Sequence, residues 1–146
     1  MRRHARNLLA VTAMLLPAAP VAAESVRFHV QFANDSAVVL EAVIRHSGGT
    51  EQKSRRVRPG KKETFEFGVQ CRNEHRRKFE VVENQTNTTI GSGSFVMKTG
   101  RERGSLENEC VYETFDLECD GDPIPDDSFE LACQEIAKDK VKITIE

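Results

Sequence analysis

The sequence predicts an all-β fold, a small antiparallel β-sandwich of immunoglobulin-like or similar design with about eight short strands. Three observations lead to this prediction. Apolar and polar residues alternate in many short stretches, which places one face of each stretch on a core. Turn-forming residues separate these stretches at the spacing typical of sandwiches and barrels. The chain also has four cysteines, an even number that indicates two disulfides in an exported protein.

The first two strands are expected over residues 26–32 and 38–44. The first stretch alternates strictly, with four apolar side chains on one register. The second is apolar and β-branched except at Glu41, which predicts a more central strand. Asn-Asp-Ser at residues 34–36 supplies the turn between them.

The next two strands surround a turn at Pro59 and Gly60, where proline presets φ and glycine accepts a positive φ. A polar strand over residues 51–57 precedes it, after a glycine-containing turn at 47–49. Residues 65–69 alternate again and lead into a cysteine.

The middle of the chain is more polar. Residues 72–78 are predicted to be a connection with at most one helical turn, and a strand begins at residues 79–81. A turn at 84–87 precedes a strand over 89–97, which two glycines loosen. Residues 99–108 are expected to form a polar loop.

The last third of the chain returns to clear alternation. One strand is expected over residues 110–119. Residues 120–127 contain a glycine and two prolines, which excludes a regular element. Residues 129–133 alternate, although 131–138 is also the best helix candidate in the chain, and 141–145 form a closing strand.

The cysteines are Cys71, Cys110, Cys119 and Cys133. A single strand from Cys110 to Cys119 would separate them by about 30 Å, which is beyond disulfide reach. The expected pairs are therefore Cys71–Cys110 and Cys119–Cys133, with Cys71–Cys119 and Cys110–Cys133 as the alternative. A zinc site is not expected, because no Cys-x-x-Cys spacing occurs.

Residues 1–23 have the three parts of a signal peptide, which are a positive head, an apolar middle and a small-residue exit. The head contains Arg2, Arg3 and Arg6. The apolar stretch, 8–21, is shorter than the roughly 20 residues that a membrane span needs. We expect cleavage after Ala23, a periplasmic or secreted location, a single sandwich domain over 24–146 and no membrane span.

Charge is unevenly distributed along the chain. Residues 45–78 carry 11 bases and 4 acids, whereas residues 104–136 carry 11 acids and no base. The favoured interpretation is that these segments lie side by side and neutralise each other. The alternative is two opposed surface patches that steer partners.

A cluster of bases flanks the Pro59–Gly60 turn, which brings its two sides to one sheet edge. We call this cluster the basic rim, and it consists of Arg55, Arg56, Arg58, Lys61 and Lys62. Residues 76–78 would extend it if the next connection lies at the same end. The expected partner of these bases is an extracytoplasmic protein or a polyanion. The alternative is that the bases only protect an edge strand against aggregation. Nucleic acid is not expected, because the exported chain is net acidic and has no Trp and one Tyr for base stacking.

No catalytic residue, metal site or cofactor is predicted. His29, His46 and His75 follow no catalytic or metal-binding spacing. The acidic loop over 120–127 has carboxylates that could serve calcium, but its spacing does not match an EF-hand. The sequence therefore predicts a non-enzymatic binding module of undefined oligomeric state. The alternative is a small secreted hydrolase or metal-dependent enzyme, which would need a cleft that joins a histidine to a carboxylate.

Overall fold

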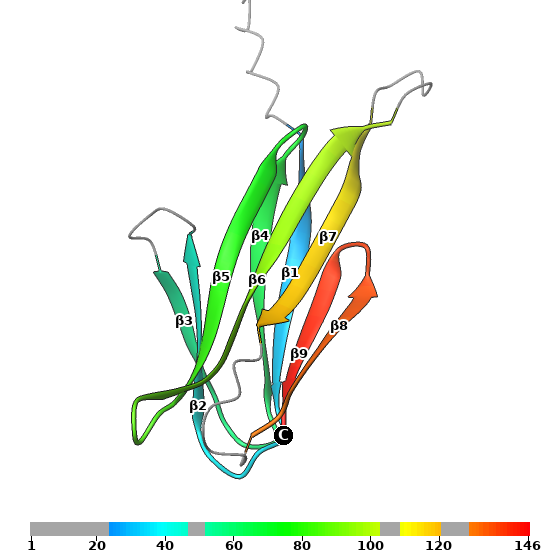
Figure 1. Cartoon of the computed structure of the whole chain (residues 1–146). Helices are drawn as coiled ribbons and strands as arrows, with labels where there is room; N and C mark the ends of the chain where they lie inside the picture. The colour runs from blue at the N-terminus through cyan, green and yellow to red at the C-terminus, as the bar shows by residue number, and fades with distance from the viewer. Residues whose placement is uncertain (1–23, 47–51, 103–108, 121–128) are drawn as a thin grey trace, which may run out of the picture.

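The alternating stretches of the sequence become the strands of two β-sheets (Figure 1). The computed structural model describes residues 24–46, 52–102, 109–120 and 129–146. Within these residues the chain forms nine strands and no helix, so the prediction of an all-β fold with about eight short strands is confirmed. No helix in this part of the chain is long and apolar enough to cross a membrane.

Some predicted features lie outside the described residues. They are the signal peptide over 1–23, the turn at 47–49, part of the loop at 99–108 and most of the acidic loop over 120–127.

Each sheet has its own strand order. The four-stranded sheet runs in the order β4 (Lys62–Gln70), β1 (Ser25–Asn34), β9 (Lys140–Ile145) and β8 (Leu131–Ala137). The five-stranded sheet runs in the order β3 (Gln52–Val57), β2 (Leu40–His46), β5 (Glu74–Glu83), β6 (Thr88–Arg101) and β7 (Cys110–Asp120).

Strands β1 and β9 run parallel, which corrects the prediction of a purely antiparallel sandwich. Val30 lies opposite Val141 and Phe32 lies opposite Ile143, and all four side chains are buried. The other neighbouring strands are antiparallel. Alternation shows which side chains face a core but carries no information on strand direction, so the sequence could not reveal this pair.

The two sheets pack face to face through aromatic side chains. Phe28 of β1 and Phe115 of β7 meet edge to face with ring centroids 5.0 Å apart. Phe67 of β4 and Phe95 of β6, one from each sheet, pack with their rings tilted and their centroids 5.7 Å apart. Such rings exclude water from the space between the layers and add roughly 0.5–1.5 kcal/mol per pair beyond their burial.

Three segments differ from expectation. Strand β5 begins at Glu74, so the predicted connection over 72–78 shrinks to a turn in which Arg72 has a φ of 60°. Strand β6 continues to Arg101 beyond a bulge at Lys98 and Thr99. The helix candidate over 131–138 is strand β8, because in seven residues a period of two and a period of 3.6 are hard to distinguish.

Two predicted turns are confirmed. The amide of Lys61 donates to the carbonyl of Arg58 over 3.0 Å, and Gly60 has a φ of 73°, as a type II turn requires. At the first turn, Asn34 is fully buried, and its side-chain carbonyl accepts a hydrogen bond from the amide of Ser36 over 2.9 Å.

The predicted cysteine pairing agrees with the structure. A disulfide joins Cys119 of β7 to Cys133 of β8, with Cα atoms 6.2 Å apart. Cys71 and Cys110 are partly buried thiols that lie within hydrogen-bond reach of each other.

Candidate functional site

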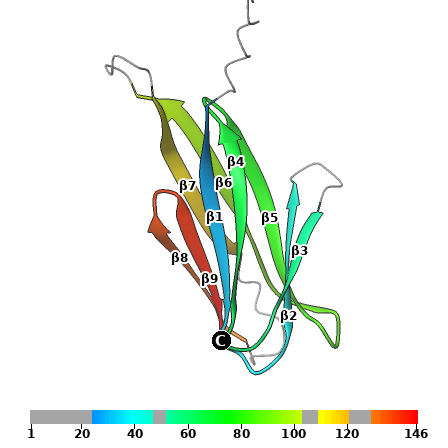
Figure 2. The same ribbon diagram turned by 180° about the vertical axis from the view of Figure 1, so that it is seen from behind.

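The two long sides of the sandwich differ. On one side the terminal strands β7 and β8 are joined by the Cys119–Cys133 disulfide. On the other side the terminal strands β3 and β4 are connected by the turn at Pro59 and Gly60. Away from that turn the two strands diverge, as both ribbon views show (Figures 1 and 2). This side of the molecule carries a hollow toward its upper end.

The opening arises because the four-stranded sheet is one strand narrower than the sheet that it faces. At the level of Phe67, strand β4 packs against Phe95 of β6. Figure 2 shows β5, β2 and β3 extending past β4. The inner face of these three strands carries polar side chains there, and they are His46, Lys53, His75 and Arg77.

A continuous depression follows this open side. Its upper hollow has a volume of about 390 Å³ and shares Lys53 with the hollow below it. That second hollow shares Ser54 and Arg55 with a third hollow, which ends near the Pro59–Gly60 turn. We call the whole depression the basic trough. Its bases are Lys53, Arg55, Arg56, Arg58, Lys61 and Arg77.

Aromatic rings of β4 hold three of these cations. The ammonium group of Lys53 lies 5.1 Å from the ring centroid of Phe67, and the guanidinium of Arg77 lies 6.0 Å from the same ring. The guanidinium of Arg55 lies 5.4 Å from the ring centroid of Phe65. Each contact contributes roughly 0.5–1 kcal/mol at an exposed site. The rings therefore reduce the freedom of the charged groups before any ligand arrives.

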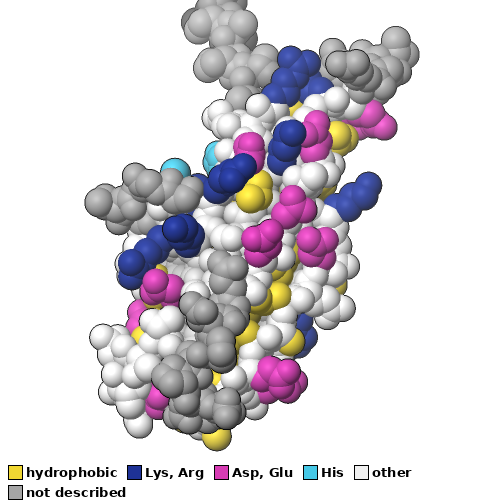
Figure 3. Space-filling view, in the orientation of Figure 1, with side chains coloured by type: hydrophobic (Ala, Val, Ile, Leu, Met, Phe, Trp, Pro, Cys, Tyr) yellow, Lys and Arg dark blue, Asp and Glu magenta, His cyan; other side chains and the backbone are white. Residues whose placement is uncertain are grey.

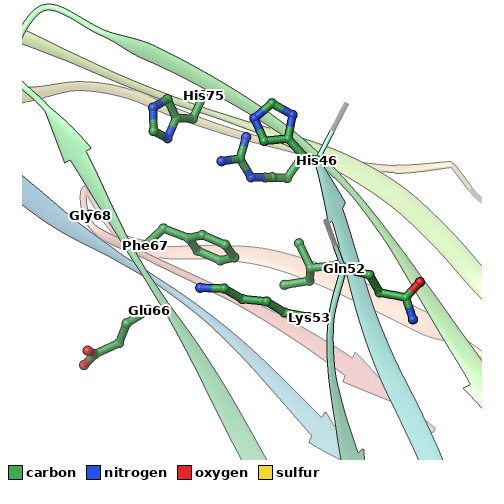
Figure 4. Close-up of a pocket in the computed structure, with 9 residues that line it drawn as sticks. His46, Gln52, Lys53, Glu66, Phe67, Gly68 and His75 are labelled. Atoms are coloured by element: carbon green, nitrogen blue, oxygen red, sulfur yellow. The ribbon is translucent and has the colours of Figure 1, made fainter. Parts of the chain in front are cut away.

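Two imidazoles occupy the upper end of the trough, above the ring of Phe67 (Figure 4). Burial, and then the nearby Arg77 and His46, lower the pKa of His75 from its ordinary value. His75 is therefore neutral at pH 7 and gains a proton only under more acidic conditions. Protonation there would add positive charge to a region that is already basic.

The upper hollow contains little negative charge to balance these bases. Among its described lining residues Glu66 is the acid, and its carboxylate lies 3.7 Å from Arg27 and 3.6 Å from His29. These partners lie on β1, outside the hollow, and Figure 4 shows the carboxylate directed away from Phe67. The carboxylate therefore does not join either His46 or His75 in a catalytic pair.

The predicted basic rim forms most of the lower end of the trough. Arg55, Arg56, Arg58 and Lys61 line one hollow together with Glu41 and Glu63. Arg55 and Glu63 form an ion pair at 3.6 Å. Lys62, at the start of β4, is not among the residues that line this hollow. Four cations thus face two carboxylates.

Residues 76–78 do not extend the rim at the turn, because β5 places them at the opposite end of the sheet. Arg76 pairs with Glu74 at 3.0 Å on the outer face. Arg77 alternates onto the inner face and reaches the upper end of the trough instead. The predicted rim included neither Arg77 at this position nor Lys53. Lys53 and Arg55 are two residues apart on one polar strand, and that spacing was the available signal.

The acidic and basic segments lie on different parts of the five-stranded sheet. Strand β6 separates β5 from the acidic strand β7. Figure 3 shows Asp and Glu side chains over β7, and Lys and Arg side chains toward β3 and the upper end. The ion pairs found among the described bases of residues 45–78 use Glu63, Glu74 and Glu80, which lie in or next to that segment. These printed pairs are local to the basic segment, and because residues 103–108 and 121–128 lie outside the described residues, mutual neutralisation stays a prediction.

The other site predictions concern metal binding and the acidic loop. In the described residues no three His, Cys, Asp or Glu side chains gather as a metal site would require. Residues 121–127 of the acidic loop lie outside those residues. Comparisons with protein-family models, with curated proteins and with solved structures give no match for this chain. Function is therefore inferred from the trough itself.

Proposed function

We propose that this protein is a non-enzymatic binding module that works outside the cytoplasm and binds an anionic partner along the basic trough. The partner class is an extracytoplasmic polyanion or an acidic protein surface. The observation that carries the proposal is the alignment of six bases along one open depression, where β3, β5 and the Pro59–Gly60 turn supply them. Clustered charge of one sign attracts oppositely charged partners and raises their rate of association.

Its location is supported by two features. The first 23 residues have the composition of an export signal. The Cys119–Cys133 disulfide is typical of proteins that fold in an oxidising compartment. We also infer that the two layers form a β-sandwich of immunoglobulin-like or similar kind, in which loops and edges provide the binding surface.

Edge protection is the competing explanation for the bases. Charged side chains on an edge strand do prevent association between sheets. Protection alone, however, requires no hollow and no aromatic ring beneath each cation. The placement of Lys53 and Arg55 on the inner face, over Phe67 and Phe65, favours a ligand site.

The second candidate function is a small hydrolase, and fewer observations support it than support the binding module. The upper hollow brings His46 and His75 together, but its acid Glu66 contacts Arg27 and His29 instead. General acid–base catalysis by a histidine usually needs a group that orients the imidazole.

Binding to immobilised heparin and to poly-glutamate at about 50 mM and about 300 mM NaCl tests the proposal, because salt screens exposed charges. We expect binding at low salt that weakens steeply at high salt. The Arg56→Glu/Arg58→Glu variant should lose most of this binding and keep the thermal midpoint of the parent protein. A matched control is Lys138→Glu/Lys142→Glu, which changes the net charge equally, in the turn between β8 and β9 and on β9, and should still bind. Absence of binding to both materials at low salt would refute the proposal.

A further inference from the structure

We propose that the basic trough takes an extended acidic segment of another polypeptide, which adds to the free edge of β4 as a fifth strand. This inference rests on the proposed function and narrows its anionic partner to a polypeptide with acidic residues at alternate positions.

The first step is the free edge. Strand β4 is terminal in its sheet, with β1 as its one neighbour among the described strands. A terminal strand leaves the amides and carbonyls of alternate residues directed away from its neighbour. Consecutive residues of β4 from Thr64 to Gly68 line the trough, which shows that the strand presents its edge there. At Gly68 no atom lies within 4 Å of the position that a side chain would occupy, so the outer face of the strand is open at this position.

The second step is the shape of the sandwich. The four-stranded sheet faces a five-stranded one, and the inner face of β3, β2 and β5 extends past β4 (Figure 2). A strand added beside β4 would lie over this uncovered area. On the other side of the sandwich, β7 and β8 already close the corresponding gap. The trough is therefore the position in this fold where one more strand completes the second layer.

The third step is the match of charge and period. Every second side chain of an added strand would face the inner surface of β3 and β5, and such side chains repeat at about 6.6–6.8 Å. Lys53 and Arg55 are two residues apart on β3, so their charges follow the same repeat. Arg77 adds a further cation at the upper end. A strand with Asp or Glu at alternate positions would place its carboxylates beside these cations.

The fourth step separates a polypeptide from a polysaccharide. A sulfated polysaccharide can contact the cations, but it cannot continue the ladder of backbone hydrogen bonds along β4. A peptide in β conformation satisfies the edge and the cations together, which is the usual basis of strand addition. Of the two kinds of ligand, only a peptide can therefore bind both the free edge of β4 and the cations of the trough.

The test uses the processed domain and synthetic peptides of about nine residues, the length of β4. The first peptide alternates Glu with Val. The second has the same sequence with N-methyl groups on alternate amides, which removes backbone donors and keeps every charge. A third groups its glutamates in one block. Affinity is measured by fluorescence anisotropy at about 50 mM salt, and backbone amide shifts of the domain are followed by NMR.

We expect the alternating peptide to bind at least about tenfold more tightly than the N-methylated and blocked peptides, equivalent to about 1.4 kcal/mol. Amide shifts should concentrate on residues 64–68. Lys53→Glu should weaken binding of the alternating peptide about tenfold. Lys78→Glu, one residue from Arg77 but on the outer face of β5, should bind as the parent does.

Two outcomes overturn the inference in distinguishable ways. Equal binding of all three peptides, or binding of heparin alone, would mean that the trough attracts anions without strand addition, which leaves the proposed function intact. Binding of neither heparin nor any peptide would remove the proposed function and the inference together.

Discussion

The side-chain amide of Asn34, the last residue of β1, donates a hydrogen bond to the carbonyl of Val57, the last residue of β3, over 2.9 Å. The same amide donates to the carbonyl of Val38 over 2.8 Å. One fully buried side chain therefore ties the two sheets together beside the Pro59–Gly60 turn, where the lower end of the trough begins.

Replacing this residue, Asn34→Ala, should lower the free energy of unfolding by about 2–4 kcal/mol, because two carbonyls lose their buried donor. Denaturant titration of parent and variant provides the measurement. Ser36→Ala removes a neighbouring hydroxyl and leaves both Asn34 donors in place, so it should cost less than half as much. A loss below about 1 kcal/mol for Asn34→Ala would contradict the role assigned to this amide.

The Cys119–Cys133 disulfide should make a covalent contribution to stability. The two residues are 14 positions apart, and Cys119→Ser/Cys133→Ser should cost about 2–4 kcal/mol, the range typical of closing a loop of this size. Peptide mapping without reduction should recover this pair and, in oxidised material, Cys71–Cys110. Recovery of a Cys110–Cys119 peptide would contradict both the pairing and the single strand β7.

In reduced protein Cys110 should react slowly with alkylating reagents. Burial, then the hydrogen bond and the charge of Cys71, raise the pKa of Cys110 to about 11. The thiolate is the reactive form, so at about pH 8 the rate should be roughly a hundredfold below that of an unfolded peptide of the same sequence. Mass spectrometry after timed exposure to iodoacetamide measures it. Rates that match the peptide would show that the thiol is not held as described.

Stability should also depend on pH through His75. Its pKa is lowered in the folded state, mainly by burial, whereas the unfolded chain keeps the ordinary value of 6.5. The unfolded state therefore binds more protons below about pH 6.5, and stability falls as pH falls through that value toward the lower folded pKa. His75→Gln should show a smaller decline between about pH 7 and about pH 5 in denaturant titrations. An unchanged decline would assign the effect to other groups.

The sequence allowed the strands with strict alternation to be predicted, because their core-facing residues are apolar. Residues 26–32 and 141–145 are of this kind. His75 and Arg77 escape this pattern for the converse reason. They lie on the inner face of β5 at its uncovered end, so polar residues occupy positions that a core would make apolar.

The same limit applies to the trough. The cluster at Arg55, Arg56 and Arg58 was visible as a local concentration of charge. The contribution of Phe67 and Arg77 was not visible in the sequence, because it depends on where β4 lies relative to the other sheet. Packing between layers is a long-range relation, and residue spacing along one strand does not encode it.

The parallel pairing of β1 with β9 also affects how the chain folds. The first strand has the last strand as a neighbour, so the four-stranded sheet cannot be completed until nearly the whole chain is available. Closing so long a loop costs entropy before any contact compensates for it, and folds dominated by distant pairings form in milliseconds to seconds. As the chain emerges from its N-terminus, β1 would therefore lack this partner until residues 140–145 are available, and completion of the four-stranded sheet would be a late step.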